Sequence, residues 1–221
     1  QISRFFVALT FIFSGFVKLV DPLGSSYKFQ EYFGVDVLNL EFLIPYALPF
    51  SVILILAEIM LGVMLLVGYL PKFTAWSLFL LILVFLFLTW YSAYYDKVTD
   101  CGCFGDAVKL STWGTFYKNV ILVVFIIILV WKSKLISPIA SKNIAKWSTF
   151  LSFFLFLYIT YYVLIHLPII DFRPYAIGKS IPEGMKMVGT ELPPIHDFYL
   201  ETNDGENLTD EVLAGDNVML I

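Results

Sequence analysis

Five runs of apolar residues dominate the sequence, and each is long enough to predict a helix that crosses a membrane. They cover residues 5–20, 45–70, 73–94, 112–131 and 147–169. A helix that spans a bilayer needs about 20 mostly apolar residues, whereas a barrel strand needs only about ten. Because backbone groups in lipid must pair within their own segment, we expect each run to form an α-helix. The first run is short and contains Ser14 and Gly15, so hydropathy alone supports it least.

The pattern changes after the last apolar run. Residues 171–194 are rich in proline and glycine and predict a linker. Residues 195–221 then predict a strand, an Asn-Asp-Gly turn, a short polar helix around residues 208–213 and a β-rich run at 218–221. We expect this segment to begin a soluble α/β domain, and both ends of the chain to be the limits of a longer protein.

The composition agrees with a membrane location. The chain is 59% hydrophobic and only 14% charged, and its mean hydropathy is +0.83. A soluble domain is near half apolar and a quarter charged. The sequence therefore predicts an integral membrane protein whose environment is a lipid bilayer. Its few basic residues form no stripe, so nothing suggests nucleic-acid binding.

The distribution of lysine and arginine among the short loops predicts the orientation. Arg4 precedes the first run, and the loop at 21–44 has one basic residue, Lys28, against four acids. The loop that holds both cysteines is net acidic. Between the fourth and fifth runs there is no acid but four basic residues, Lys132, Lys134, Lys142 and Lys146. We expect a multi-pass protein of the bacterial inner membrane, with a cytoplasmic N-terminus and with the cysteine loop and C-terminus in the periplasm.

Both cysteines, Cys101 and Cys103, lie in the stretch TDCGCFGDA at residues 99–107. On the predicted outer side disulfides form and persist. A structural disulfide is one interpretation, but a bridge between residues two apart closes almost no loop and adds little stability. A metal site is another, but tetrahedral zinc takes four ligands, and His166 and His196 lie at no ligand-like spacing from the pair. We therefore expect no metal.

Redox exchange is the third interpretation of the cysteine pair, and the one that the spacing favours. A Cys-Gly-Cys bridge forms a small strained ring, and strained, exposed disulfides exchange readily. Gly102 and Gly105 allow the tight backbone that such a loop requires. Asp100 and Asp106 flank the pair, and their negative charge disfavours thiolates.

Two ionisable residues lie inside the predicted spans. Glu58 is near the middle of the second run, where a charge is costly and by default indicates a functional site. The alternative is a protonated glutamic acid that bonds a neighbouring helix. Gly62 lies one turn further on the same face and would let another helix approach closely. Lys118, about two turns into the fourth run, either extends to the outer interface or interacts with Glu58, which we expect to lie deeper.

Other polar residues gather at the predicted outer ends of the spans. Lys18 ends the first run and His166 ends the fifth. With Lys118 and the cysteine loop they would form an outer cluster able to bind a polar head group such as a quinone ring. Glu58, Lys18, Lys118 and His166 are therefore the candidate quinone-binding residues. The aromatic residues that lead into the cysteine loop more often form an interface belt; they are Trp90, Tyr91, Tyr94 and Tyr95.

Three stretches resemble one family of membrane proteins: FIFSGFVKLVDP at 11–22, LAEIMLGVMLLVG at 56–68 and DCGCFGD at 100–106. They are similar to DoxX-like proteins and, among these, to the MauE-type proteins of methylamine utilisation, over residues 1–132. The resemblance implies a four-helix membrane domain, in some respects like the vitamin K epoxide reductase bundle. It also implies disulfide chemistry in the periplasm, usually with a thioredoxin-like partner.

The C-terminal stretch IHDFYLETNDGENLTDEVLAGDNVMLI resembles the first strands of a thioredoxin-like domain of the TlpA type. The CxxC motif of such a domain is not found within the 221 residues. The predicted fold class is an all-α membrane protein, with a four-helix transmembrane bundle and a fifth transmembrane helix before an α/β domain. The predicted units are 1–132, the membrane domain; 133–170, a cytoplasmic loop and the fifth helix; 171–194, a periplasmic linker; and 195–221, the start of the thioredoxin-like domain.

These features predict a membrane thiol–disulfide oxidoreductase. Cys101 and Cys103 would be the catalytic residues, and they would exchange electrons between a periplasmic thioredoxin-like domain, in cis or in trans, and a quinone. The alternative is a non-catalytic membrane anchor that positions a redoxin or a larger membrane protein complex. A quinone-linked oxidase subunit is disfavoured, because no span offers paired histidines for haem. The sequence does not indicate the direction of electron flow.

Overall fold

Every regular element in the described part of the chain is a helix. The computed structural model describes residues 1–35, 37–95, 111–166 and 170. The α-helices are α1 (Ile2–Val20), α2 (Pro22–Phe33), α3 (Ala47–Val67), α4 (Pro71–Tyr95), α5 (Thr112–Trp131) and α6 (Lys142–Ile165). Two short 3-10 helices join them, η1 (Glu41–Tyr46) before α3 and η3 (Ser133–Leu135) after α5.

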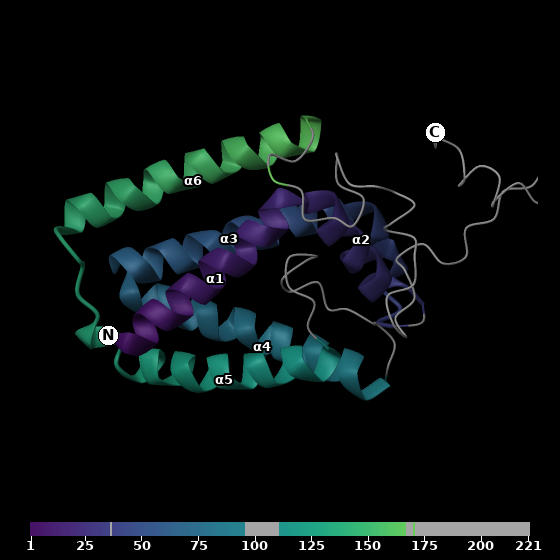
Figure 1. The fold of residues 1–221 in the computed structure, drawn as a ribbon, viewed down its shortest axis with the longest axis horizontal. Coiled ribbons are helices and arrows are strands. Elements are labelled where there is room, and N and C mark those ends of the chain that lie inside the picture. The colour runs from purple at the N-terminus through teal and green to yellow at the C-terminus, as the bar shows by residue number, and fades with distance from the viewer. Residues whose placement is uncertain (36, 96–110, 167–169, 171–221) are drawn as a thin grey trace, which may run out of the picture. The chain divides into compact units, whose positions relative to one another are not determined.

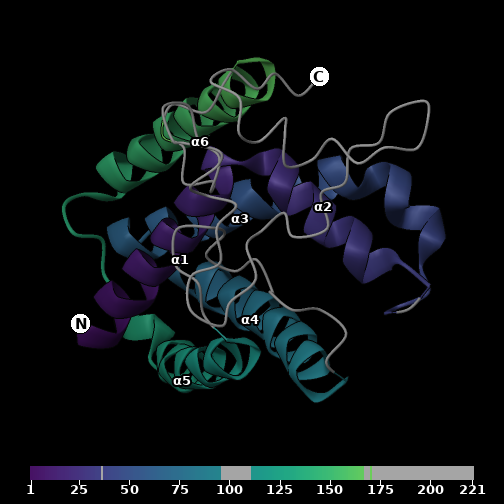
Figure 2. The same cartoon turned by 45° about the vertical axis from the view of Figure 1, so that its right-hand side comes forward.

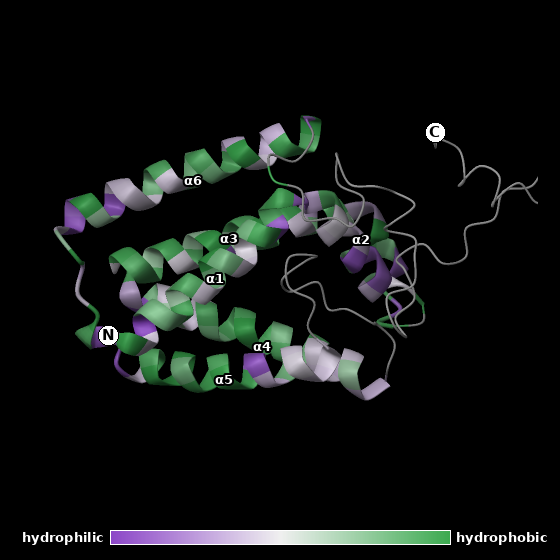
Figure 3. Cartoon of the chain, viewed as in Figure 1, coloured by the Kyte–Doolittle hydropathy of each residue, from purple (hydrophilic) through white to green (hydrophobic). Residues whose placement is uncertain are grey.

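Five of the described helices are long and apolar enough to cross a membrane. They are α1, α3 with η1, α4, α5 and α6, which confirms the five spans predicted from hydropathy. Figure 3 shows their ribbons mostly in the colour of hydrophobic residues. Helix α6 begins five residues before the predicted span, because the Ser141 side chain caps it by accepting a hydrogen bond from the Ile144 amide.

The predicted loop at 21–44 is wrong in one respect, because it contains α2. Asp21 caps this helix by accepting a hydrogen bond from the Gly24 amide at 2.9 Å. Pro22 follows at the first helical position, where its missing amide hydrogen costs nothing. The helix ends at Gly34, whose amide bonds the carbonyls of Gln30 and Glu31. Figure 3 shows more hydrophilic residues on α2 than on its neighbours.

Four helices share one apolar core. Buried side chains of α1, α3, α4 and α5 meet in it, namely Val7, Ala8, Phe11, Leu61, Leu65, Leu78, Ile82, Leu122, Ile126 and Leu129. Helix α1 packs mainly on α3, and α4 packs mainly on α5. Figures 1 and 2 both show α6 on the far side of α1 and α3 from α5. The described spans therefore form a four-helix bundle with α6 placed against its outer surface.

The second half of α6 joins the bundle through a smaller apolar cluster. Phe156 and Ile159 of α6 pack on Leu19 of α1 and on Ile55 and Ile59 of α3. Most of the remaining surface of α6 is exposed and apolar, which suits a helix that faces lipid.

The two ends of the bundle are defined by side-chain contacts. At one end, called here the Arg4 end, Arg4 of α1 binds the C-terminal end of α3 and the link between α5 and α6. At the other, called here the α2 end, Tyr32 bonds Ser92 of α4 at 3.1 Å, and Tyr91 donates to the Val37 carbonyl at 2.9 Å. The predicted cysteine loop, linker and α/β segment lie outside the described residues.

Candidate functional site

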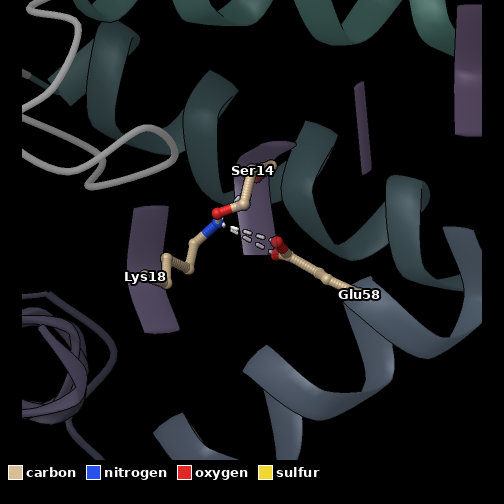
Figure 4. Close-up of polar contacts among 3 residues, drawn as sticks. All are labelled: Ser14, Lys18 and Glu58. Atoms are coloured by element: carbon tan, nitrogen blue, oxygen red, sulfur yellow. Dashed lines mark hydrogen bonds and ion pairs between the residues drawn. The ribbon is translucent and has the colours of Figure 1, made fainter. Parts of the chain in front are cut away.

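A buried ion pair joins the first and second membrane-spanning helices. The Lys18 ammonium donates to both carboxylate oxygens of Glu58, at 3.0 and 2.9 Å, and to the Ser14 hydroxyl at 2.8 Å (Figure 4). The side chains are 6% and 0% exposed. An ammonium group has three donors, so these contacts use them all. Paired charges of this kind are the form in which ionisable groups are tolerated between membrane helices.

Small residues bring the two backbones close enough for the pair to form. A Cβ atom added to Gly15 of α1 would lie 2.5 Å from Ile59 Cγ1 and 3.2 Å from Glu58 Cβ on α3. One added to Gly62 of α3 would lie 3.0 Å from the Ala8 carbonyl oxygen on α1. Each helix thus presents a glycine to its neighbour beside a charged residue. The prediction that Gly62 lets another helix approach closely is confirmed.

The ion pair is bordered by helices α4 and α5. The Lys18 ammonium lies 5.6 Å from the centre of the Phe85 ring of α4, within the range of a cation–π interaction. Asn119 of α5 donates to the Thr89 hydroxyl of α4 at 3.2 Å. Polar groups from all four bundle helices therefore meet in the half of the bundle nearer the α2 end.

A very small cavity lies among α1, α4 and α5, and Ser14, which bonds Lys18, is part of its lining. Its volume is about 10 Å³, and its polar lining comes from Thr10 and Ser14 of α1 and from Lys118 and Asn119 of α5. This volume is about the smallest that holds one water molecule. Lys118 thus reaches the same polar layer as Lys18, although the ion pair of Glu58 is made with Lys18.

His166 lies at the opposite end of the fifth span from the lysine loop, as predicted. It follows the last residue of α6 and is exposed. Its ring stacks on Tyr162, with centroids 4.4 Å apart and an angle of 11° between the planes. Within the described part of the chain, these contacts with Tyr162 are the interactions of His166. The structure brings Lys18, Glu58 and Lys118 into one layer, but it does not bring His166 to them.

The predicted outer surface position of Lys18 is wrong. Lys18 is only 5% exposed, because α1 continues to Val20 and α2 begins directly after it. Its ammonium turns back along α1 to Ser14 and across to Glu58 instead of reaching the surface. The four-residue spacings Ser14 to Lys18 and Glu58 to Gly62 place these residues on one face of each helix, but they do not show that the two faces meet.

Arg4 forms a second buried site, at the Arg4 end of the bundle. Its guanidinium donates to the carbonyls of Leu65, Leu66 and Ser137 at 2.8, 2.9 and 2.9 Å, and the residue is 3% exposed. Gly68 ends α3 with φ of +77°, and a Cβ there would lie 2.6 Å from Arg4 Nη2. Arg4 entered the predicted orientation only, and its structural role at this end of the bundle was not predicted from sequence.

The segment that holds Cys101 and Cys103 connects α4 to α5. It lies outside the described residues, but the helices that it joins end at Tyr95 and begin at Thr112, at the α2 end of the bundle. The aromatic residues before it pack on one another. The ring centroids of Trp90 and Tyr94 are 5.7 Å apart, and those of Tyr91 and Tyr95 are 4.7 Å apart. Both ends of the cysteine segment are therefore attached to the part of the bundle that also contains the ion pair.

Residues 1–132 match the family described as methylamine utilisation protein MauE. The chain belongs to this family. The match covers α1 to α5 and ends directly after Trp131, so the MauE unit is the four-helix bundle with α2, and α6 lies beyond it. No curated protein and no solved structure matches the chain. This MauE-family chain is a membrane protein, which is consistent with a membrane component of a redox or methylamine-utilisation system.

Proposed function

We propose that this MauE-family protein is a membrane thiol–disulfide oxidoreductase that works through Cys101 and Cys103. The observation that carries the proposal is the Cys-Gly-Cys spacing in the segment between α4 and α5 of a MauE-family bundle. Two thiols this close, in a chain with no other cysteine, suit exchange better than they suit stapling. The partner is a periplasmic thioredoxin-like domain, in cis or in trans, and the protein lies in the bacterial inner membrane with its N-terminus in the cytoplasm.

The exchange proceeds through a mixed disulfide. A thiolate of the thioredoxin-like domain attacks one sulfur of the Cys101–Cys103 disulfide, and the other sulfur leaves as a thiolate. The second thiol of the domain then displaces the attacked cysteine, which leaves the domain oxidised and Cys101 and Cys103 reduced. Two electrons and two protons then pass from these thiols to a membrane carrier, and the disulfide forms again. In the opposite direction of electron flow the same steps run in reverse.

The carrier we propose is a quinone, which accepts two electrons and two protons to become a quinol. The cavity that Ser14, Lys118 and Asn119 line is about 10 Å³ in the described conformation, which is too small for a quinone ring, since small-molecule sites are about 300–1,000 Å³. Lys18 also has all three donors in use. We therefore place the electron step at the cysteine segment, and we assign the ion pair the role of holding α1 against α3.

The test is to trap the mixed disulfide in membranes that contain the full-length protein. When the Cys101 thiolate attacks the disulfide of an oxidised thioredoxin-like domain, Cys103 is the thiol that resolves the mixed disulfide. If Cys101 is the attacker, Cys103→Ala should therefore accumulate a covalent adduct with the domain that dithiothreitol releases. Cys101→Ala is the matched variant, and we expect it to differ from Cys103→Ala in adduct yield. The adduct is measured by non-reducing electrophoresis after the free thiols have been blocked.

Two further measurements separate this proposal from its alternatives. In an oxidising pathway, alkylation of thiols in cells should show reduced Cys101 and Cys103 accumulating when quinone is depleted. An unchanged redox state of the two thiols would exclude quinone as the electron carrier. The proposal fails if neither single variant forms an adduct or alters the redox state of the partner domain. A chain with both cysteines changed to serine that still supports function would instead indicate a membrane anchor.

A further inference from the structure

A groove on the outer surface of the bundle, between α3 and α6, has the size and lining of a ligand site. Its volume is about 630 Å³, within the range of about 300–1,000 Å³ typical of small-molecule sites. Ile53, Leu56 and Met60 of α3 line one wall, and Phe150 and Phe153 of α6 line the other. The lining is almost wholly apolar. This groove is separate from the cavity beside the ion pair, and the proposed redox function does not use it.

The groove exists because α6 touches α3 closely over only part of its length. Phe156 and Ile159, in the second half of α6, pack on the apolar cluster that contains Ile55 and Ile59. The first half of α6 borders the groove instead. The chain just before α6 is attached to the end of α3, since the Ile139 amide donates to the Val67 carbonyl at 3.2 Å. Both walls are thus part of fixed helices.

The polar groups of the groove lie at one end of it. Lys146 is in the second turn of α6, and Tyr69 lies two residues after the end of α3, so both belong to the Arg4 end of the bundle. The remaining polar side chain, Thr149, donates its hydroxyl to the Ala145 carbonyl at 2.8 Å. An apolar channel with a cation at one end matches an amphiphile with a negative head.

We propose that this groove binds an anionic phospholipid, with an acyl chain along α3 and α6 and the phosphate at Lys146. Residues 132–146 contain four lysines and no acid, and in the described part of the chain no acidic side chain pairs with Lys146. Basic pockets between membrane helices bind anionic head groups for this reason. A quinone carries no negative charge, so this concentration of lysine gives no reason to select it.

The experiment measures lipid retention by the purified full chain. The protein is exchanged into detergent, incubated with phosphatidylglycerol or with zwitterionic phosphatidylcholine, and analysed by native mass spectrometry. We expect phosphatidylglycerol to be retained preferentially. Lys146→Gln should weaken its apparent affinity roughly fivefold, the effect of one lysine near an anionic lipid surface. Lys134→Gln is the matched control, because Lys134 lies on η3 at the same end but does not line the groove.

A second variant tests the groove independently of charge. Met60→Trp adds bulk to its wall and should reduce retention of phosphatidylglycerol, whereas Ile121→Trp, at an exposed site on α5, should not. The proposal is overturned if both lipids are retained equally, or if Lys134→Gln weakens binding as much as Lys146→Gln does. It is also overturned if ubiquinone displaces phosphatidylglycerol from the wild-type chain at equal concentration.

Discussion

Replacing Glu58 with glutamine should destabilise the protein far more than the same change at an exposed ion pair. Glu58 is fully buried, and its two carboxylate oxygens accept hydrogen bonds from the Lys18 ammonium at 3.0 and 2.9 Å. Glutamine keeps one acceptor oxygen but turns an amide group toward the ammonium. The variant therefore removes the negative charge that faces the Lys18 ammonium between α1 and α3.

The size of the effect follows from the surroundings of Lys18. Removing one partner of a buried ion pair costs about 3–5 kcal/mol in soluble proteins. Hydrogen bonds between membrane helices contribute less, about 0.6 kcal/mol on average, and the Ser14 hydroxyl still accepts from Lys18 at 2.8 Å. We expect Glu58→Gln to lower the free energy of unfolding by about 3 kcal/mol, at the lower limit for a buried pair.

Lys18→Met should have a similar effect, because it leaves the Glu58 carboxylate without its partner. In the double variant neither charge remains. We expect it to cost about 3 kcal/mol and not the sum of about 6, since removing both members of a buried pair avoids the unpaired charge. The difference of about 3 kcal/mol is the coupling energy that a double-mutant cycle measures.

The assay is equilibrium unfolding in mixed micelles with increasing dodecyl sulfate, followed by tryptophan fluorescence and helical circular dichroism. The control is Glu31→Gln. Glu31 pairs with Lys28 at 3.1 Å on the surface of α2, and its side chain is 38% exposed, so we expect a loss below about 1 kcal/mol. Equal losses for the two glutamine variants would refute the reasoning, and so would additive effects in the cycle.

Two further predictions concern the helix contacts around this pair. Gly15→Ala should lower the free energy of unfolding by about 1–3 kcal/mol in the same assay, because the added methyl group would lie 2.5 Å from Ile59 Cγ1. Val120→Ile also adds one carbon, but at an exposed site, and should change the free energy of unfolding little. Equal effects of the two variants would contradict the close packing of α1 on α3. Arg4→Gln should release the link between α5 and α6 by removing the donor to the Ser137 carbonyl. Trypsin should then cleave after Lys132 and Lys134 several times faster than in wild type. An unchanged cleavage rate would show that Arg4 does not hold this link.

The five spans could be predicted from sequence because hydropathy depends on composition and length alone. Helix α2 could not be predicted from hydropathy, because its residues are as polar as those of a loop and its local signal is short. That signal is present, however, in the cap at Asp21, in Pro22 at the first helical position and in the stop at Gly34. Capping chemistry would have found what hydropathy missed.

The candidate site shows the same limit. Glu58 could be selected from sequence because a charge in the middle of a span is costly. Its partner could not be selected, because Lys18 is 40 residues away and the pairing depends on how α1 and α3 are rotated about their axes. Hydropathy placed Lys18 at a helix end and therefore at the surface, whereas the glycines that bring the two helices together bury it.

The contacts of Arg4 impose an order on biosynthesis. Two of its carbonyl partners, Leu65 and Leu66, belong to the second membrane-spanning helix. The third, Ser137, follows Arg4 by 133 residues. At about 5–20 residues per second, a ribosome takes roughly 7 to 27 s to reach Ser137 after it has made Arg4. The contacts that fix this end of α1 are therefore completed only after α5 has been made, and the carbonyls of Leu65 and Leu66 hold the Arg4 guanidinium in the meantime.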